Sequence, residues 1–186
     1  MWKLRKQANK PDGSLPMPEK AKLRAIDPSP GRHTAVRKAG VSDVKEMFRL
    51  INHYAERQQM LPKTQLQLYE NLRDYSIAAG ASASTGLLGC GALHIYWENL
   101  AEIRALAVAP EVTHRGVGTA LVELLLDEAR ELEIEQVFLF TYEPQFFARF
   151  GFFQVEPRTL PLKVYNECFH CPKFSKCDEL AMVLHI

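Results

Sequence analysis

A short turn rich in glycine and basic residues follows an apolar segment and opens an amphipathic one. The turn is THRGVGT, residues 113–119. Glycine lets the backbone approach a ligand closely, and the first N–H groups of a helix are unpaired and carry the positive end of its dipole. The residues predicted to hold a phosphate group are Arg115, Gly116, Val117, Gly118 and Thr119, with the arginine as a permanent cation.

Three nucleotide-binding motifs do not fit this turn. A P-loop ends in Gly-Lys-Ser/Thr, but Gly118 is followed by Thr119 and Ala120. The dinucleotide fingerprint has a third glycine where this chain has Leu121. A kinase glycine loop lies between two strands, whereas this turn precedes a helical pattern. The phosphate therefore belongs to another kind of ligand.

Composition sets the limits for the rest of the chain. The 186 residues suit one domain, 47% of them are hydrophobic, and a formal charge of +1 favours neither nucleic acid nor a membrane as partner. We see neither a membrane-length apolar run nor a signal sequence, so we expect a cytoplasmic protein. Residues 1–33, rich in lysine and proline, are predicted to be a flexible tail before a domain over 34–186.

Hydrophobic periodicity predicts the elements that must position the turn. A segment rich in alanine, glycine and serine, Ser76–Thr85, is predicted to join two strands. Predicted strands are Thr34–Lys38, Leu87–Trp97, Leu100–Val108, Gln136–Thr141, Phe152–Val155 and Leu180–His185. A first helix is predicted after the cap Ser42, with an apolar face of Val44, Met47, Phe48, Ile51 and Tyr54. A second is predicted after the cap Thr64 and carries Leu66, Leu68, Leu72 and Tyr75. Two more are predicted at Gly116–Leu132 and Phe146–Arg149.

The turn and the order of these elements resemble the GNAT acetyltransferase superfamily. Its pattern, Gln/Arg-x-x-Gly-x-Gly/Ala after a strand that ends near a proline, corresponds to residues 113–118, with Thr113 in place of the usual Gln or Arg. The resemblance implies an α/β (α+β) GNAT fold. It would have a mixed, mostly antiparallel sheet of six to seven strands, with the fourth and fifth splayed apart, and about four helices. Acetyl-CoA would lie in the gap.

A narrower resemblance rests on the C-terminal third. The segments TYEPQFFARFGF and TLPLKV, with CFHCPKFSKCDELAM after them, resemble the short, single-domain bacterial N-acetylglutamate synthases. Upstream, LPKT with LYENLRDY and the strand EIRALAV agree with the same group. The implied reaction is acetyl transfer from acetyl-CoA to the α-amine of L-glutamate, the first step of arginine biosynthesis. The kinase-like domain of the longer synthases, and feedback by arginine through it, are not expected.

The resemblance assigns roles to the strand and the short helix. Backbone groups of Leu106, Ala107 and Val108 would pair with the pantetheine arm and polarise the thioester carbonyl. The other interpretation is that these are core strand residues, and the two roles are compatible. Phe147 stands where the superfamily often has the tyrosine that protonates the leaving thiolate, and we place it at the cofactor.

Glu102 is the candidate general base, because an ammonium must lose a proton before it attacks. A surface glutamate is the alternative. Tyr142 could replace the missing acid, with a stacking role or protonation by solvent as alternatives. Glutamate has two carboxylates, so we expect cations at the acceptor, namely Lys63, Arg104 and Lys163. Solvated surface charges are the alternative for these three.

Three cysteines cluster near the C-terminus as Cys168-x2-Cys171-x5-Cys177. This spacing suits a structural zinc ion, with His170 nearby. The other hypothesis is a loop of reduced thiols over the acceptor site. A different acceptor, such as another amino acid, a polyamine or a protein N-terminus, also stays open, as does a non-catalytic acetyl-CoA sensor. The oligomeric state is open too, a homodimer being one assembly.

Overall fold

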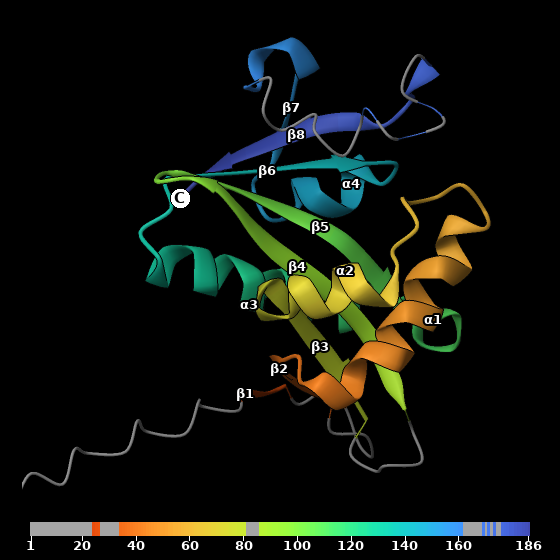
Figure 1. Ribbon diagram of the computed structural model, residues 1–186. Coiled ribbons are helices and arrows are strands. Elements are labelled where there is room, and N and C mark those ends of the chain that lie inside the picture. The colour runs from red at the N-terminus through yellow and green to blue at the C-terminus, as the bar shows by residue number, and fades with distance from the viewer. Residues whose placement is uncertain are drawn as a thin grey trace, which may run out of the picture.

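A mixed sheet of eight strands forms the centre of the protein (Figure 1). The computed structural model describes residues 24–26, 34–80, 86–161, 169, 171, 173 and 176–186. The strand order is β1-β2-β3-β4-β5-β6-β8-β7. The strands are β1 (Arg24–Ile26), β2 (Thr34–Lys38), β3 (Tyr75–Ala79), β4 (Leu87–Trp97), β5 (Leu100–Val108), β6 (Gln136–Thr141), β7 (Phe153–Val155) and β8 (Leu180–His185).

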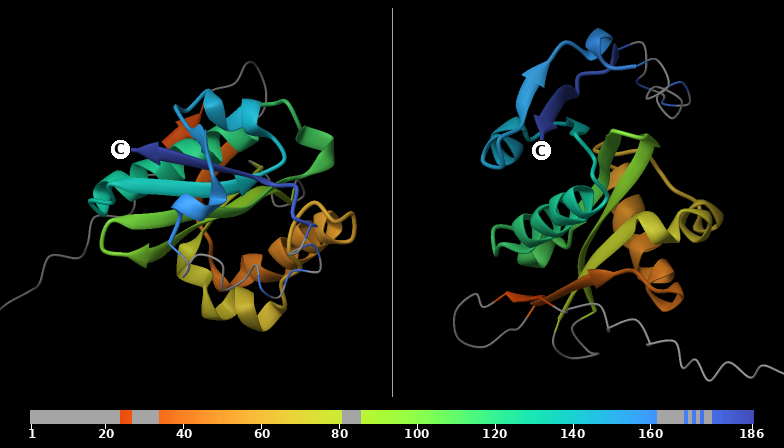
Figure 2. Two further views of the ribbon diagram at one scale, coloured as in Figure 1. Left: turned by 90° about the horizontal axis from the view of Figure 1, so that it is seen from above. Right: turned by 90° about the vertical axis from the view of Figure 1, so that its left-hand side faces the viewer.

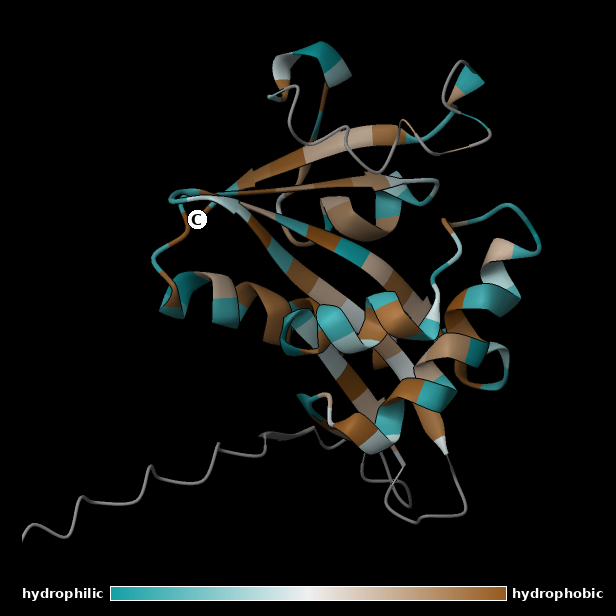
Figure 3. Ribbon diagram, in the orientation of Figure 1, coloured by the Kyte–Doolittle hydropathy of each residue, from teal (hydrophilic) through white to brown (hydrophobic). Residues whose placement is uncertain are grey.

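Helices cover both faces of this sheet. The helices α1 (Val44–Ala55) and α2 (Gln65–Glu70) lie over one face, and α3 (Val117–Glu131) lies over the other (Figure 2). The short α4 (Pro144–Ala148) contributes its Phe147 to the core that α3 forms against the sheet. Short 3-10 turns occur at Val41–Asp43, Leu72–Asp74, Pro110–Val112 and Pro157–Thr159. In Figure 3 the apolar residues, drawn in brown, lie along the strands and alternate with hydrophilic residues along the helices.

The GNAT-type fold predicted from the sequence is confirmed, and the structure adds the strand β3 to the strands predicted from β2 onward. One further strand, β1, pairs antiparallel with β2 and falls within residues 1–33, which the sequence analysis predicts as a tail. Among the helices of the described residues, none is long and apolar enough to cross a membrane.

Several predicted boundaries shift for local reasons. Asp43, not Ser42, precedes α1, and its carboxylate accepts a hydrogen bond from the Gly40 N–H at 2.7 Å. Thr64 caps α2 as expected, but the helix ends at Glu70, and Tyr75 begins β3. The small residues of Ser76–Thr85 mislead the prediction: Ser76–Ala79 belongs to β3, and residues 81–85 lie outside the described part. The helix α4 begins at Pro144, two residues before its predicted start, because proline is favoured at the first position of a helix.

The strands β5 and β6 part after a short parallel contact. Their pairing is limited to Leu100–Glu102 of β5 against Gln136–Phe138 of β6. Beyond that contact β5 stays paired with β4 up to Val108, and β6 stays paired with β8 up to Thr141. The two strands therefore diverge (Figure 1). Counted from β2, they are the fourth and fifth strands, so the predicted splay is present.

A bulge in β5 lies just past the point of divergence. Ala105 has a left-handed φ of 51°, and the register of the β4–β5 ladder shifts between Cys90 and Ala92. A bulge bends its strand and increases the local twist. Gly91 stands opposite, where a Cβ would lie 3.0 Å from Leu106 Cδ1. The missing side chain thus leaves room for the bulged residue, and the bend directs β5 away from β6.

Replacing Gly89 with alanine is expected to destabilise the fold. A Cβ at this position would lie 2.9 Å from the carbonyl oxygen of Ala107 and 3.0 Å from Leu121 Cδ1. The backbone of β5 and the start of α3 would both have to move, so we expect Gly89→Ala to lower the free energy of unfolding by about 1 to 3 kcal/mol. Urea unfolding measures this change.

Gly40→Ala is the matched control. Its added Cβ would be 3.5 Å from the nearest atom, Asp43 Oδ2, which is ordinary contact. We expect a change within about 0.5 kcal/mol for it. Equal stability of the two variants would show that the close packing around Gly89 does not constrain the sheet.

Candidate acyl-transfer site

The predicted phosphate turn connects β5 to α3. Pro110–Val112 forms a 3-10 turn, and residues 113–116 complete the connection to the helix. Gly116 precedes the helix with a left-handed φ of 82°, and a Cβ there would meet no atom within 4 Å. Ala120 N–H donates to the Gly116 carbonyl at 3.0 Å. The amides of residues 117–119 come before this bond, so the helix offers them no carbonyl partner and they point out of its start.

Gly118 brings the start of α3 close to α4. A Cβ on Gly118 would lie 3.3 Å from Phe146 Cζ and 3.5 Å from Val108 Cγ2. Phe146 is therefore the α4 ring that reaches the turn, and the sequence analysis did not single it out. Phe147 is buried and packs edge-on against Phe146 and Phe152, which favours a core role.

Beyond Glu102, the edge of β5 that does not pair with β4 faces the gap between β5 and β6. Ala109 N–H donates to the Leu88 carbonyl of β4 at 2.8 Å, so the alternation of a strand directs the backbone of Ala107 toward β4 as well. The backbone groups of Leu106 and Val108 then point the other way. Of the three residues predicted to contact the pantetheine arm, two present their amides to the gap.

Tyr54 of α1 reaches this edge. Its hydroxyl donates to the Val108 carbonyl at 2.5 Å. Burial, with a smaller contribution from the charge of Glu111, raises the pKa of Tyr54, so the hydroxyl stays a donor. Sequence periodicity placed this residue on the apolar face of a helix and gave no sign of the bond, which depends on how α1 packs against β5.

Glu102 is the β5 residue at which the pairing with β6 ends. It lies opposite Phe138 of β6 and opposite His94 of β4. The hydroxyl of Tyr96 lies 3.3 Å from Glu102 Oε2 and donates to it. The predicted base is half-buried and lies where the gap begins. Its neighbours Ala101 and Ile103 belong to the core that α3 covers, so Glu102 is on the opposite face of the sheet, with α1 and α2.

Arg104 lies two residues further along the same face of β5. Its Nη2 is 3.6 Å from Oδ2 of Asp74, and its side chain is 10% exposed. Nδ1 of His94 is 2.6 Å from the same oxygen. Neither Asp74 nor His94 was predicted from the sequence, because their contact joins a 3-10 turn to a strand and no local pattern marks it.

The two predicted lysines differ in what the structure shows. Lys63 is in the connection between α1 and α2, where Asn52 Nδ2 donates to its carbonyl at 2.9 Å. Lys63 N–H donates to Asn52 Oδ1 at 3.3 Å, so the backbone of this segment is fixed to α1. Lys163 lies outside the described residues.

Tyr142 follows β6 and joins a polar cluster. Its hydroxyl donates to Asp178 Oδ1 at 2.8 Å and accepts from Lys173 Nζ at 3.2 Å. Lys173 Nζ also donates to the Gln58 carbonyl at 3.1 Å. Burial, followed by the hydrogen bond to Asp178, raises the pKa of Tyr142. Because the Tyr142 hydroxyl already donates its hydrogen to Asp178 and its pKa is raised, a structural role suits this residue better than the role of a general acid.

The cysteine cluster gives the zinc hypothesis no support. No group of three or more His, Cys, Asp or Glu side chains in the described part of the chain could hold a metal ion. Cys171 and Cys177 have free thiols, and Lys173 N–H donates to the Cys171 sulfur at 3.4 Å. Cys168 and His170 lie outside the described residues.

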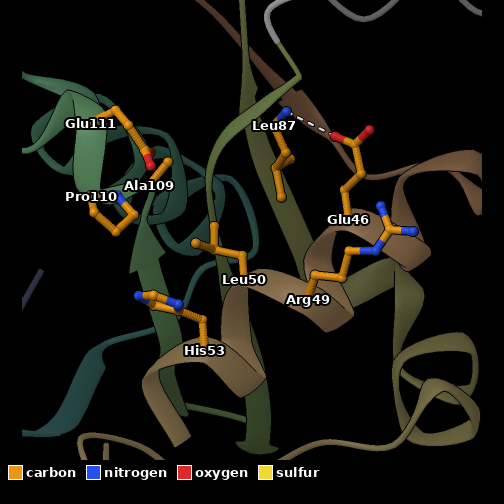
Figure 4. Close-up of a pocket in the computed structure, with 8 residues that line it drawn as sticks. All are labelled: Glu46, Arg49, Leu50, His53, Leu87, Ala109, Pro110 and Glu111. Atoms are coloured by element: carbon orange, nitrogen blue, oxygen red, sulfur yellow. Dashed lines mark hydrogen bonds between the residues drawn. The ribbon is translucent and has the colours of Figure 1, made fainter. Parts of the chain in front are cut away.

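A shallow depression of about 280 Å³ opens beside the turn, between α1 and the end of β5 (Figure 4). Glu46 Oε2 accepts from the Leu87 N–H at its rim at 2.8 Å, and Arg49 and His53 supply basic groups. None of the residues predicted for the site lines it. The lining residues are Glu46, Arg49, Leu50, His53, Leu87, Ala109, Pro110 and Glu111.

Comparison with known proteins decides the family. The sequence model of the Acetyltransferase (GNAT) family matches residues 42–152, which include α1, the gap and the turn. The chain belongs to this family. The GNAT domain accordingly contains the diverging strands and the helix start at which the superfamily is expected to hold acetyl-CoA.

Two relatives cover most of this GNAT domain. An amino-acid acetyltransferase of Mycobacterium tuberculosis is 39% identical over 132 residues, 71% of this chain and 75% of the relative. An uncharacterised N-acetyltransferase of Chlorobaculum tepidum is 35% identical over 154 residues, 83% of this chain and 97% of the relative.

Solved structures agree. A Mycobacterium tuberculosis protein in complex with CoA has a TM-score of 0.69 and 34% identity, and the match covers 81% of this chain and 98% of that one. N-acetylglutamate synthase from Neisseria gonorrhoeae has a TM-score of 0.72 and 23% identity over 82% of this chain and 35% of its own. The second likeness shows the fold.

The left-handed conformation of Gly116 can be tested by substitution. Gly116→Ala adds a methyl group that meets no neighbour, so its cost is the backbone strain alone. We expect a loss of about 1 to 2 kcal/mol in the free energy of unfolding. Gly116→Asn should lose less, because asparagine tolerates this conformation. Thermal unfolding compares them, and an alanine variant as stable as the parent would contradict the assigned φ.

Proposed function

We propose that this GNAT domain transfers the acetyl group of acetyl-CoA to the α-amine of L-glutamate. The observation that carries the proposal is the position of Glu102, a carboxylate at the point where β5 leaves β6, on the strand that leads to the phosphate turn. The names of the relatives support an amino-acid acceptor, and the Neisseria structure contains CoA and N-acetyl-glutamate.

The acyl donor would lie along β5. Its pyrophosphate would accept hydrogen bonds from the amides at the start of α3, with Arg115 exposed beside them. The pantetheine arm would pair with the free edge at Leu106 and Val108, as an added strand does. Because Val108 accepts a bond from Tyr54, the arm would meet one carbonyl that is already occupied. This path points the thioester toward Glu102.

The acceptor would be held on the face that carries Glu102. Arg104 is directed to this face, and its guanidinium can bind a carboxylate with two parallel hydrogen bonds. Asp74 balances part of its charge, so an acceptor carboxylate would share the guanidinium with Asp74 or displace it. Lys63, and Lys163 from the segment before β8, would add positive charge for the second carboxylate of glutamate.

The chemistry then needs few groups. Glu102 would take a proton from the substrate ammonium, directly or through water, and the free amine would attack the thioester carbonyl. A backbone N–H of β5 would stabilise the developing oxyanion. The thiolate that leaves would be protonated from solvent, since the hydroxyl of Tyr142 donates to Asp178.

The homodimer predicted from the sequence stays a prediction.

The acceptor is tested with a panel of amino acids and spermidine. Turnover, measured as CoA-thiol release corrected for protein thiols, should be highest with L-glutamate. Arg104→Ala should raise KM for the acceptor by about 10-fold or more, because a charge-assisted hydrogen bond contributes about 1.5 to 3 kcal/mol. KM for acetyl-CoA should change little.

Arg130→Ala is the matched control for Arg104→Ala, since Arg130 on α3 pairs at 3.1 Å only with its helix neighbour Asp127 among the ion pairs of the described residues. It should leave both KM values unchanged. Turnover that peaks on another amine would keep the transferase and replace the substrate. Tight acetyl-CoA binding without turnover on any amine would instead indicate a sensor.

Glu102→Gln tests the base. The amide keeps the shape and can still contact Tyr96, but it cannot accept a proton from the ammonium. We expect kcat to fall by about 100-fold to 10,000-fold while acetyl-CoA binding persists. Steady-state kinetics with a parallel titration of CoA separates the two quantities. A variant with the parent kcat would exclude Glu102 as the base.

A further inference from the structure

Acetyl transfer to an amine releases a proton that must leave the site. The substrate nitrogen starts as an ammonium and loses two protons on the way to the amide. The thiolate of CoA takes up one of them, so each turnover releases one proton to solvent. Glu102 is half-buried: the hydroxyl of Tyr96 donates a hydrogen bond to its carboxylate, and Phe138 is its partner on β6. The proton taken up by Glu102 must therefore pass to solvent before the carboxylate can act again.

His94 and Asp74 form an oriented pair beside this base. Nδ1 of His94 lies 2.6 Å from Asp74 Oδ2. An ionised carboxylate only accepts hydrogen bonds, so this contact places the ring hydrogen on Nδ1 and leaves the lone pair of Nε2 available. The same logic orients the histidine in hydrolase triads, where a carboxylate fixes the tautomer of the base.

The imidazole of His94 belongs to the residue paired with Glu102 across the sheet, and it is partly exposed. His94 and Glu102 are direct partners across the β4–β5 ladder, which puts their Cβ atoms about 4.5 to 5.5 Å apart. Tyr96, which bonds Glu102, also contacts the His94 ring edge-on with centroids 4.9 Å apart. The His94 side chain is 29% exposed, so it reaches water.

From this arrangement we infer that the Asp74–His94 pair carries the released proton from Glu102 to solvent. The inference rests on the proposed function and adds two residues to it. His94 acts through Glu102 and Asp74 through His94, so both are positioning residues that restore the base between turnovers. Asp74 also contacts Arg104, and the pair therefore joins the proton route to the predicted acceptor cation.

The protons balance at each step. An N–H bond of the substrate ammonium breaks as an O–H bond forms on Glu102. That O–H bond then breaks, directly or through one water molecule, as an N–H bond forms at Nε2 of His94. The imidazolium gives a proton to bulk water and returns to the neutral tautomer that Asp74 holds. No redox partner or further reactant is needed.

The test is loss and chemical rescue in the intact protein. His94→Ala should lower kcat by about 10-fold to 100-fold, less than the loss of a general base itself would cause, with KM for acetyl-CoA unchanged. The vacated site opens to solvent, so added imidazole should restore turnover, and more basic imidazoles should restore more. The N-acetyl amino acid is the product to quantify, because imidazole can itself accept an acetyl group.

His185→Ala is the matched control, since His185 lies at the end of β8 and stacks on Phe153. It should keep the parent kcat and show no response to imidazole. His94→Gln is the second variant should the alanine variant fail to fold. Its amide can donate to Asp74 but cannot relay a proton, so its kcat should fall as far.

Two results would overturn the relay. One is a parent-like kcat in either His94 variant. The other is a folded His94→Ala protein with reduced kcat that no imidazole restores, which would assign His94 a purely structural role. Absence of turnover by the unchanged protein on every amine is a distinct result: it would overturn the proposed function itself, and the relay with it.

Discussion

The bulge at Ala105 is the constraint on which the rest of the site depends. The β5–β6 pairing ends at Glu102, and the bulge follows three residues later. The left-handed residue bends β5 away, and Gly91 leaves space for the displaced Leu106. Beyond Glu102 one edge of β5 is thereby not paired with β6, while β4 still pairs with the other edge. The open edge leads directly to the unpaired amides at the start of α3.

The polar residues on the α1–α2 face form one connected group. Tyr96 contacts both Glu102 and His94, His94 contacts Asp74, and Asp74 contacts Arg104. Buried polar groups are stable only when their hydrogen bonds are made, so such a group orients each member. The predicted base, Glu102, and the predicted acceptor cation, Arg104, thus belong to one connected group. Substituting either one should change how the other is oriented.

Local pattern was enough to predict β4, β5, β6 and β8 to the residue, and the glycine turn with its helix. Alternation, apolar runs and glycine carry that information within a short window. The strand β3 was missed because the small residues from Ser76 onward are typical of a loop. In the structure, small side chains at these positions let β3 pack against α3. Contacts such as Tyr54 with Val108 and Asp74 with His94 depend on long-range packing, for which a single sequence has no local signal.

Binding of the acyl donor along the free edge of β5 and at the start of α3 can be measured by titrating isotope-labelled protein with CoA and following the amide NMR signals. We expect the amides of Leu106, Val108 and residues 117–119 to shift and to become protected from exchange, while those of β7 do not change. Shifts confined to the depression at Arg49 and His53 would contradict this binding mode, because CoA would then bind away from the gap.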